Sequence, residues 1–268
     1  MANNKLQFDI MNCAGWAYQS IWQEKSLLIK VALIPFIVKI LFYFLLVTQF
    51  AEADLLRKTL VRLPDFFIEA WLLIGFIRLV AFRDSRFLLP FGGSKDAQEA
   101  RDRRNVRAGI LLYVITQLAF AAYNHGIFSF MPDISETETA PDPMRVFGMM
   151  AAIILVIRFF NVLWLYIPQV ISGELGPYFQ ATNSMGTSFR FFLVWLVSIL
   201  PLTLIFFGVF GVILEPFEGQ ISQAPIMVLA GVTLLQSFYE LLIGLVQITG
   251  IYYAVYYTRH EADKLGRK

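Results

Sequence analysis

The chain has 268 residues, of which 57% are hydrophobic and only 16% are charged. Soluble domains average roughly 45–50% apolar and about 25% charged residues, and the mean hydropathy of this chain is +0.62. These values exclude an ordinary soluble enzyme and a disordered chain. The net charge of +2 gives no reason to expect a nucleic-acid partner. A single cysteine, Cys13, excludes an internal disulfide, and with only two histidines we expect no metal or other cofactor.

Apolar runs of membrane-spanning length recur along the chain. A bilayer core of about 30 Å needs about 20 apolar residues in one helix. The runs are continuous, whereas barrel strands alternate polar and apolar residues, so helices are favoured. We therefore predict an all-α polytopic membrane protein, a single integral membrane domain over 1–268. Its six transmembrane helices are expected at about 27–50, 66–82, 107–130, 146–171, 190–214 and 225–257.

The distribution of Lys and Arg between these runs predicts the orientation. The loop at 83–106, with Arg107 beyond it, is strongly basic, and so is the C-terminal tail. The loops after the third and fifth runs are acidic. Because cytoplasmic loops carry the excess of basic residues, six spans satisfy this pattern only with both termini in the cytoplasm. Residues 51–65 are then outside, although Arg62 and two other basic residues weaken that assignment.

Residues 9–26 are too polar to cross a membrane. Trp16 and Trp22 favour the headgroup region, so we predict an interfacial helix on the cytoplasmic leaflet, with a disordered tail as the alternative. The segment 173–189 has a similar position before the fifth run. Four arginines in or directly after the basic loop are expected to contact anionic lipid headgroups or, alternatively, a cytoplasmic protein partner; they are Arg101, Arg103, Arg104 and Arg107.

Charged residues inside the runs are the candidate functional groups, because a charge in the bilayer is costly. Arg158 is about 12 residues into the fourth run and Glu240 about 15 residues into the sixth, so equal rise per residue puts them at similar depth. We predict an ion pair between them, serving either as a structural pair or as a substrate or proton site; the alternative is that the two residues do not meet. Other polar residues inside the runs are Glu69, Arg78, Asn161, Gln236 and Gln247, besides Lys30 and Lys39.

Two pairs of glycines, Gly208 with Gly211 and Gly244 with Gly250, offer small faces for helix packing. The sequence contains no Ser/His/Asp set, no HExxH motif and no paired carboxylates in a plausible cleft. We therefore expect a protein that is not an enzyme.

Three segments resemble a known family. They are GWAYQSIWQEKSLLIKVALIPFIVK at 15–39, the stretch 163–201 that contains LWLYIPQVISGELGPYFQ, and GIYYAVYYTRHEAD at 250–263. Their organisation resembles the YciC-like family and the related membrane domain attached to some glycerophosphodiester phosphodiesterases. The resemblance implies a six-helix protein of the bacterial cytoplasmic (inner) membrane without an assigned activity. The phosphodiesterase domain is absent from this sequence, so its chemistry does not carry over.

These observations lead to two main functional hypotheses, with an enzyme acting on lipid as a third. The first is a non-enzymatic structural or accessory subunit of a membrane complex, or a protein of envelope maintenance. The second is a small transporter or lipid-handling protein that uses an intramembrane site at Arg158 and Glu240. The second hypothesis requires a cavity that reaches the charged residues.

Overall fold

The computed structural model describes residues 8–50, 53–84, 88, 97–130, 143–217 and 225–266. All regular structure in these ranges is helical, which confirms the all-α prediction. Within the described ranges, four helical stretches are long and apolar enough to cross a membrane: Lys25–Gln49, Glu99–Tyr123, Met185–Leu214 and Ile226–Thr258. This arrangement fits a multi-pass membrane protein.

The first helix, α1 (Ile10–Gln23), begins where the Asp9 side chain accepts hydrogen bonds from the backbone N–H groups of Met11 and Asn12. It packs against the last two long helices. The Trp16 ring stacks on Tyr257 with ring centroids 5.0 Å apart. Cys13 is fully buried in this contact, and burial, with a smaller contribution from Asp9, raises the pKa of its thiol to about 12. The thiol is therefore protonated at neutral pH.

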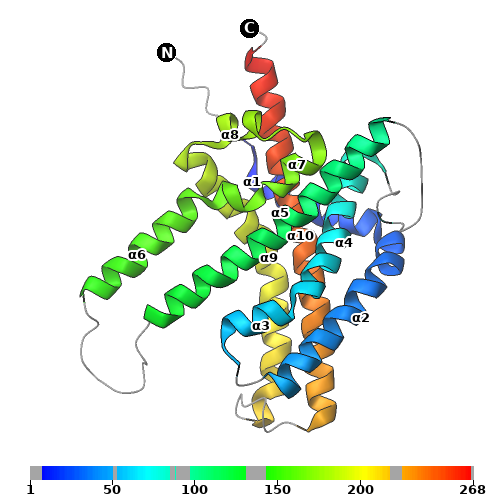
Figure 1. Ribbon diagram of the computed structural model, residues 1–268, viewed down its shortest axis with the longest axis vertical. Helices are drawn as coiled ribbons and strands as arrows, with labels where there is room; N and C mark the ends of the chain where they lie inside the picture. Colours follow the sequence, from blue (N-terminus) through cyan, green and yellow to red (C-terminus); the bar gives the residue numbers. More distant parts are fainter. Residues whose placement is uncertain are drawn as a thin grey trace.

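Helix α4 (Leu63–Phe82) is the centre of the fold. It follows α2 (Lys25–Gln49) and the short helix α3 (Leu55–Val61), whose first turn is capped by Asp54. Leu72, Leu73 and Ile74 have no exposed surface. Figure 1 shows α2, α5 and α10 arranged around α4. Its 20 residues include Asp65, Glu69 and Arg78, three charges that its neighbours must compensate.

The predicted fourth span at 146–171 is not one helix. Helix α6 (Pro143–Arg158) ends early, and a 3-10 turn, η2 (Phe160–Trp164), leads to α7 (Tyr166–Ser172). An unbroken helix would lose one backbone bond at Pro168, which instead lies in the first turn of α7, where proline is tolerated. The Tyr178 hydroxyl also donates to the backbone oxygen of Asn161 at 2.7 Å. Both features stabilise the break.

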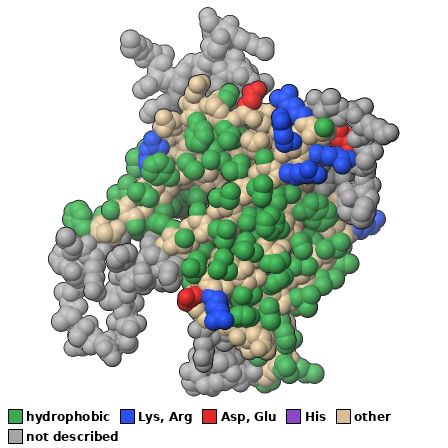
Figure 2. All heavy atoms as spheres, in the orientation of Figure 1, with side chains coloured by type: hydrophobic (Ala, Val, Ile, Leu, Met, Phe, Trp, Pro, Cys, Tyr) green, Lys and Arg blue, Asp and Glu red, His purple; other side chains and the backbone are tan. Residues whose placement is uncertain are grey.

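The remaining elements are α5 (Ala97–Phe130), α8 (Gly176–Thr182), α9 (Met185–Leu214), the 3-10 turn η3 (Glu215–Phe217) and α10 (Ile226–Gly266). Helices α9 and α10 form one antiparallel pair. In Figure 1, α1 and the C-terminal part of α10 lie at the same end of the molecule. In Figure 2, hydrophobic side chains cover the middle of the visible face, and Lys and Arg lie mostly toward that end. Parts of the predicted basic loop, 85–87 and 89–96, lie outside the described residues.

Candidate functional site

Five charged side chains meet between α2, α4 and α10. These residues, Lys39, Arg62, Asp65, Glu69 and Glu240, are called the charge cluster below. The Lys39 ammonium group donates to Glu69 Oε2 at 2.8 Å, to Glu240 Oε2 at 3.1 Å and to Asp65 Oδ2 at 3.3 Å. The Lys39 side chain has no exposed area. One lysine therefore binds carboxylates from two helices.

Arg62 is the second cation of the charge cluster, and it lies at the junction of α3 and α4. Its Nη2 atom is 2.9 Å from Glu240 Oε2 and 3.1 Å from Asp65 Oδ2. The guanidinium carbon is 4.7 Å from the ring centroid of Tyr43 and 5.2 Å from that of Phe66. The aromatic rings hold the guanidinium group in place while it binds the carboxylates.

Lys39 and Glu240 lie far from the ends of their helices. Lys39 is ten residues from the end of α2, about 15 Å, and Glu240 is fourteen residues from the start of α10, about 21 Å. Asp65 and Glu69 are four residues apart and share one face of α4. Helix α10 packs directly on α4 at Gly244, where a Cβ atom would be in van der Waals contact with Glu69 Oε1 at 3.4 Å. The charge cluster thus lies in the middle of two candidate spans.

The charge cluster carries two cations and three carboxylates, which is a net charge of −1 when all five groups are ionised. Uncharged donors add to it. Gln236 donates to Glu240 Oε1 at 3.1 Å, and the Tyr113 hydroxyl lies with Glu69 in the same wall of the site. Burying ions is costly unless each is paired and hydrogen-bonded. The two cations and these donors lower that cost without balancing the charge.

A cavity of about 300 Å³ opens beside the charge cluster, between α3, α4, α5 and α10. Arg62 and Glu240 face it and keep 20% and 25% of their side-chain surface exposed. The remaining lining combines aromatic and amide side chains with a few aliphatic ones: Leu55, Thr59, Phe66, Glu69, Tyr113, Gln117, Phe120, Ala121, Ile243 and Gln247. This cavity can admit a small polar group to the charged side chains.

A second, apolar groove of about 640 Å³ runs along α2, α9 and α10. Tyr43, Gly211 and Leu229 line it, together with Gln236, the residue that binds Glu240. The groove and the cavity therefore follow neighbouring parts of the same helix, α10.

The predicted pair of Arg158 and Glu240 is wrong. The Arg158 guanidinium group donates to the backbone and side-chain oxygens of Asn183 at 3.4 and 3.0 Å. Glu240 instead binds Lys39 and Arg62. The prediction assumed an unbroken fourth span, but Arg158 is the last residue of α6 and the chain turns there.

The other predicted polar residues have separate partners. Glu69 is in the charge cluster with Glu240, and Gln236 donates a hydrogen bond to Glu240. Gln247 lines the cavity and accepts a hydrogen bond from the Trp195 indole at 2.9 Å. Asn161 donates to Thr182. Arg78 does not reach the surface, as a snorkelling arginine would. It is buried and lies 3.0 Å from Asp102.

The proposed lipid-contacting residues differ in exposure. Trp22 is 70% exposed, with the Lys25 ammonium group 3.5 Å from its ring centroid, but Trp16 packs on α10. Arg103 pairs with Glu99, one turn earlier on α5. The exposed arginines of this helix are Arg101, Arg104 and Arg107. Their binding to anionic lipid stays a prediction.

Sequence reasoning missed Lys39, Arg62 and Asp65 as members of the site. Lys39 gave a usable signal, because a lysine in the middle of an apolar run needs a partner. Arg62 and Asp65 precede the second apolar run and gave no such signal. Their position in the site depends on how α3 connects α2 to α4.

No family model, curated protein or solved structure matches the chain. Among the residues that the structure describes, no group of His, Cys, Asp and Glu could hold a metal ion. The functional proposal therefore depends on the geometry of the charge cluster.

Proposed function

We propose that this protein is a six-pass membrane protein that binds a small polar molecule or a lipid headgroup at the charge cluster, without performing catalysis on it. The single observation that carries the proposal is the position of the charge cluster. It lies in the middle of α2 and α10, beside a cavity of about 300 Å³. A transporter or a lipid-handling protein needs such a site.

The six-pass topology adds α4 and the broken segment from α6 to α7 to the four candidate spans. An even number of passes is supported by the common end at which α1 and the C-terminal part of α10 lie (Figure 1). The exposed arginines of α5 support a cytoplasmic position for that end. A bacterial cytoplasmic membrane is proposed from the resemblance to the YciC-like family.

A purely structural ion network would account for the buried ion pairs. It would not account for the excess of carboxylates or for the exposure of Glu240 to the cavity. Charges that only join helices are best paired evenly and kept away from solvent, since an unbalanced buried charge is costly. Here the carboxylates outnumber the cations, and Glu240 keeps a quarter of its side chain exposed to the cavity. This imbalance supports a binding site.

The test compares Glu240→Gln with Arg158→Gln, since Arg158 donates to Asn183 and has no bond to a member of the charge cluster. Each protein is purified in a mild detergent, its helix content is measured by circular dichroism, and its bound lipids and solutes are identified by mass spectrometry. We expect a bound polar molecule in the wild type and in Arg158→Gln that is lost from Glu240→Gln. Identical bound molecules in all three proteins would overturn the proposal.

A second pair of variants tests the cavity without changing a charge. Ala121 lines the cavity and its neighbour Ala122 does not. Ala121→Leu narrows the cavity, so we expect it to lose the bound molecule at unchanged helix content. Ala122→Leu adds the same volume at an exposed position and is expected to keep it. Equal retention by both variants would contradict binding in the cavity.

The accessory-subunit hypothesis is a second candidate because α6 is poorly covered. Phe147 is 78% exposed, Met150 57% and Leu155 55%, so apolar side chains remain uncovered around most of this helix. Lipid chains or a helix of a partner protein would cover them. A membrane protein that co-purifies in stoichiometric amount would support the subunit hypothesis, and a protein that purifies alone would contradict it.

A further inference from the structure

We infer that the cavity beside the charge cluster binds the ammonium group of an amine whose neighbouring group is anionic, as in an aminophospholipid headgroup or a free phosphorylated amine. The inference rests on the proposed function and names the ligand class for that site. It depends on the charge balance of the cluster, on the aromatic lining of the cavity and on the free donor of Arg62.

The charge balance favours a cationic ligand group. With all five groups ionised, the charge cluster has an excess of one negative charge. The Glu240 side chain carries this charge to the cavity wall, with a quarter of its surface exposed. An ammonium group beside Glu240 would offset the negative charge at that wall and form a charge-assisted hydrogen bond, which is roughly twice as strong as a neutral one.

The aromatic lining suits an ammonium group as well. Phe66, Tyr113 and Phe120 contribute rings to the cavity. Cations bind favourably over aromatic faces, and more strongly where water is excluded. Arg62 already uses the Phe66 ring in this way, at 5.2 Å. Gln117 and Gln247 add amide groups to the same wall.

The anionic part of the ligand is matched by Arg62. This side chain binds Asp65 through Nε and Nη2 and Glu240 through Nη2. Within the described ranges, no hydrogen bond from its Nη1 atom is found. A phosphate or carboxylate next to the ammonium group could accept from this nitrogen. The site would then bind a zwitterion, with the ammonium group on Glu240 and the anion on Arg62.

Two sources could supply this chemistry. The cavity residues Glu240 and Ile243 lie on the same stripe of α10 as Gln236 and Leu229 of the apolar groove, at helical spacings of three, four and seven residues. A lipid could therefore place its acyl chain in the groove and its headgroup at the charge cluster. A free phosphorylated amine would use the cavity alone.

The first experiment measures ligand class. The delipidated protein in detergent is titrated with phosphatidylethanolamine or with phosphatidylglycerol, which lacks the amine, and binding is followed by native mass spectrometry. We expect the amine lipid to bind at least about tenfold more tightly, a difference of about 1.4 kcal/mol. Ala121→Leu should abolish this preference, and Ala122→Leu should keep it. Equal or tighter binding of phosphatidylglycerol in the cavity would overturn the amine assignment while leaving the proposed function intact. If neither lipid nor any soluble probe binds, the proposed function itself fails.

The second experiment distinguishes the two sources. Gly211 lines the groove and Gly208 does not, and both positions have open space for a side chain. If the ligand is a lipid, Gly211→Phe weakens phosphatidylethanolamine binding and Gly208→Phe does not. If the ligand is a free amine, phosphoethanolamine binds the wild type and both variants equally, and the lipid shows no dependence on the groove. If Ala121→Leu weakens the binding of neither phosphatidylethanolamine nor phosphoethanolamine, the assignment is overturned.

Discussion

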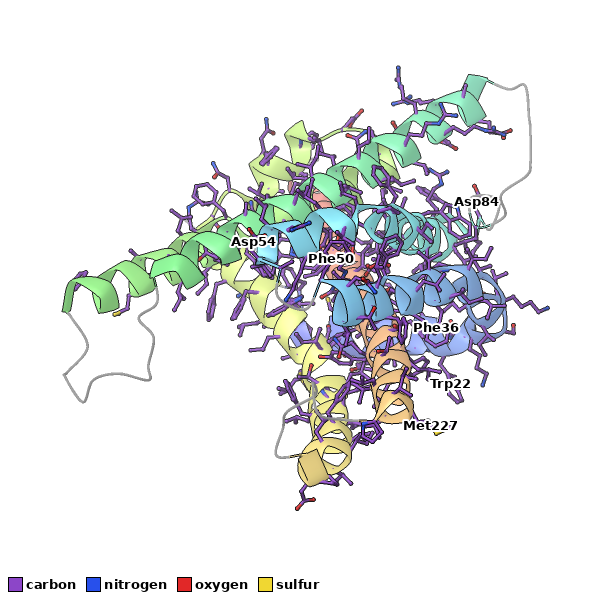
Figure 3. All side chains as sticks on the ribbon, turned by 60° about the horizontal axis from the view of Figure 1, so that its bottom comes forward. Trp22, Phe36, Phe50, Asp54, Asp84 and Met227 are labelled. Carbon is purple, nitrogen blue, oxygen red and sulfur yellow. The ribbon has the colours of Figure 1, made fainter. Side chains whose placement is uncertain are left out.

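Helix α4 buries charged groups near both of its ends, and the two sites differ in depth. Toward Phe82, Arg78 lies 3.0 Å from Asp102 and 3.6 Å from Asp84, and it donates to the Val170 carbonyl at 3.3 Å. Toward Leu63, the charge cluster gathers five ionisable side chains beside a cavity. Figure 3 shows Asp84 at the Phe82 end of α4, with Phe50 and Asp54 where α2 leads into α3.

The two sites lie at different distances from the ends of their helices. Arg78 is four residues from the end of α4, about 6 Å, so its partners lie close to the boundary of the apolar region. Lys39 is about 15 Å from the end of α2. Both sites take partners from three segments of the chain; the charge cluster lies deeper along α2 and α10, and a cavity opens beside it. Depth together with a cavity makes the charge cluster the functional candidate.

The largest effect is expected for Lys39→Met. It removes the ammonium group that three carboxylates share and leaves Arg62 as the cation of the charge cluster. Breaking a buried ion pair from one side costs about 3–5 kcal/mol, so the variant should lose that free energy of unfolding in detergent titrations. Lys30→Met removes an exposed lysine from the same helix and is the control. Equal stability of the two variants would contradict the buried position of Lys39.

Arg78→Met should have a smaller effect. The carboxylates that it leaves behind, Asp84 and Asp102, keep 10% and 17% of their side chains exposed. Since they can reach water when Arg78 is removed, we expect a loss of about 1–3 kcal/mol. The same unfolding titration ranks this variant against Lys39→Met. A larger loss for Arg78→Met would reverse the comparison between the two ends of α4.

Gly244→Val tests the close approach of α10 to α4 at the charge cluster. A Cβ atom at Gly244 meets Glu69 Oε1 and Leu73 Cδ2, each at 3.4 Å, whereas one at Gly211 meets nothing within 4 Å. Overpacking typically costs about 1–3 kcal/mol, so Gly244→Val should destabilise the protein at the lower part of that range and Gly211→Val should not. If both variants unfold alike, helix separation at Gly244 is not limiting.

The smallest effect is expected for Arg158→Gln. Its guanidinium group binds Asn183 at the end of α6, away from both buried sites of α4. Such substitutions usually change stability by less than about 0.5 kcal/mol. A thermal unfolding scan of the variant should therefore coincide with that of the wild type. A clear loss of stability would show that Arg158 has a buried partner.

The sequence predicted the helices better than their contacts. Long apolar runs identified α2, α5, α9 and α10, because length and hydropathy are local properties. The same reasoning failed at 146–171, where a hydrogen bond from Tyr178 to Asn161, 17 residues earlier, stabilises the break. Hydropathy cannot register a contact of that kind.

The sequence predicted some members of the candidate site but not others. Glu69, Gln236 and Glu240 were selected as charged or polar residues inside apolar runs, and they do lie together. Their cationic partners, Lys39 and Arg62, were not predicted, because equal rise per residue along unbroken spans puts Arg158 level with Glu240. Of the two glycine pairs predicted to allow helix packing, only one lies against another helix. A Cβ atom on Gly244 or Gly250 would contact a neighbouring helix, but none would on Gly208 or Gly211.

The central claim is that Glu240 pairs with Lys39 in the charge cluster, and a double-mutant cycle tests it most directly. Unfolding free energies are measured for Lys39→Met, Glu240→Gln and the double variant, and for the matching set with Arg158→Gln. We predict a coupling energy of at least about 1 kcal/mol between Lys39 and Glu240, within the range seen for contacting residues. Arg158 and Glu240 should be additive within about 0.5 kcal/mol. Additivity for Lys39 and Glu240, with coupling between Arg158 and Glu240 instead, would contradict the account.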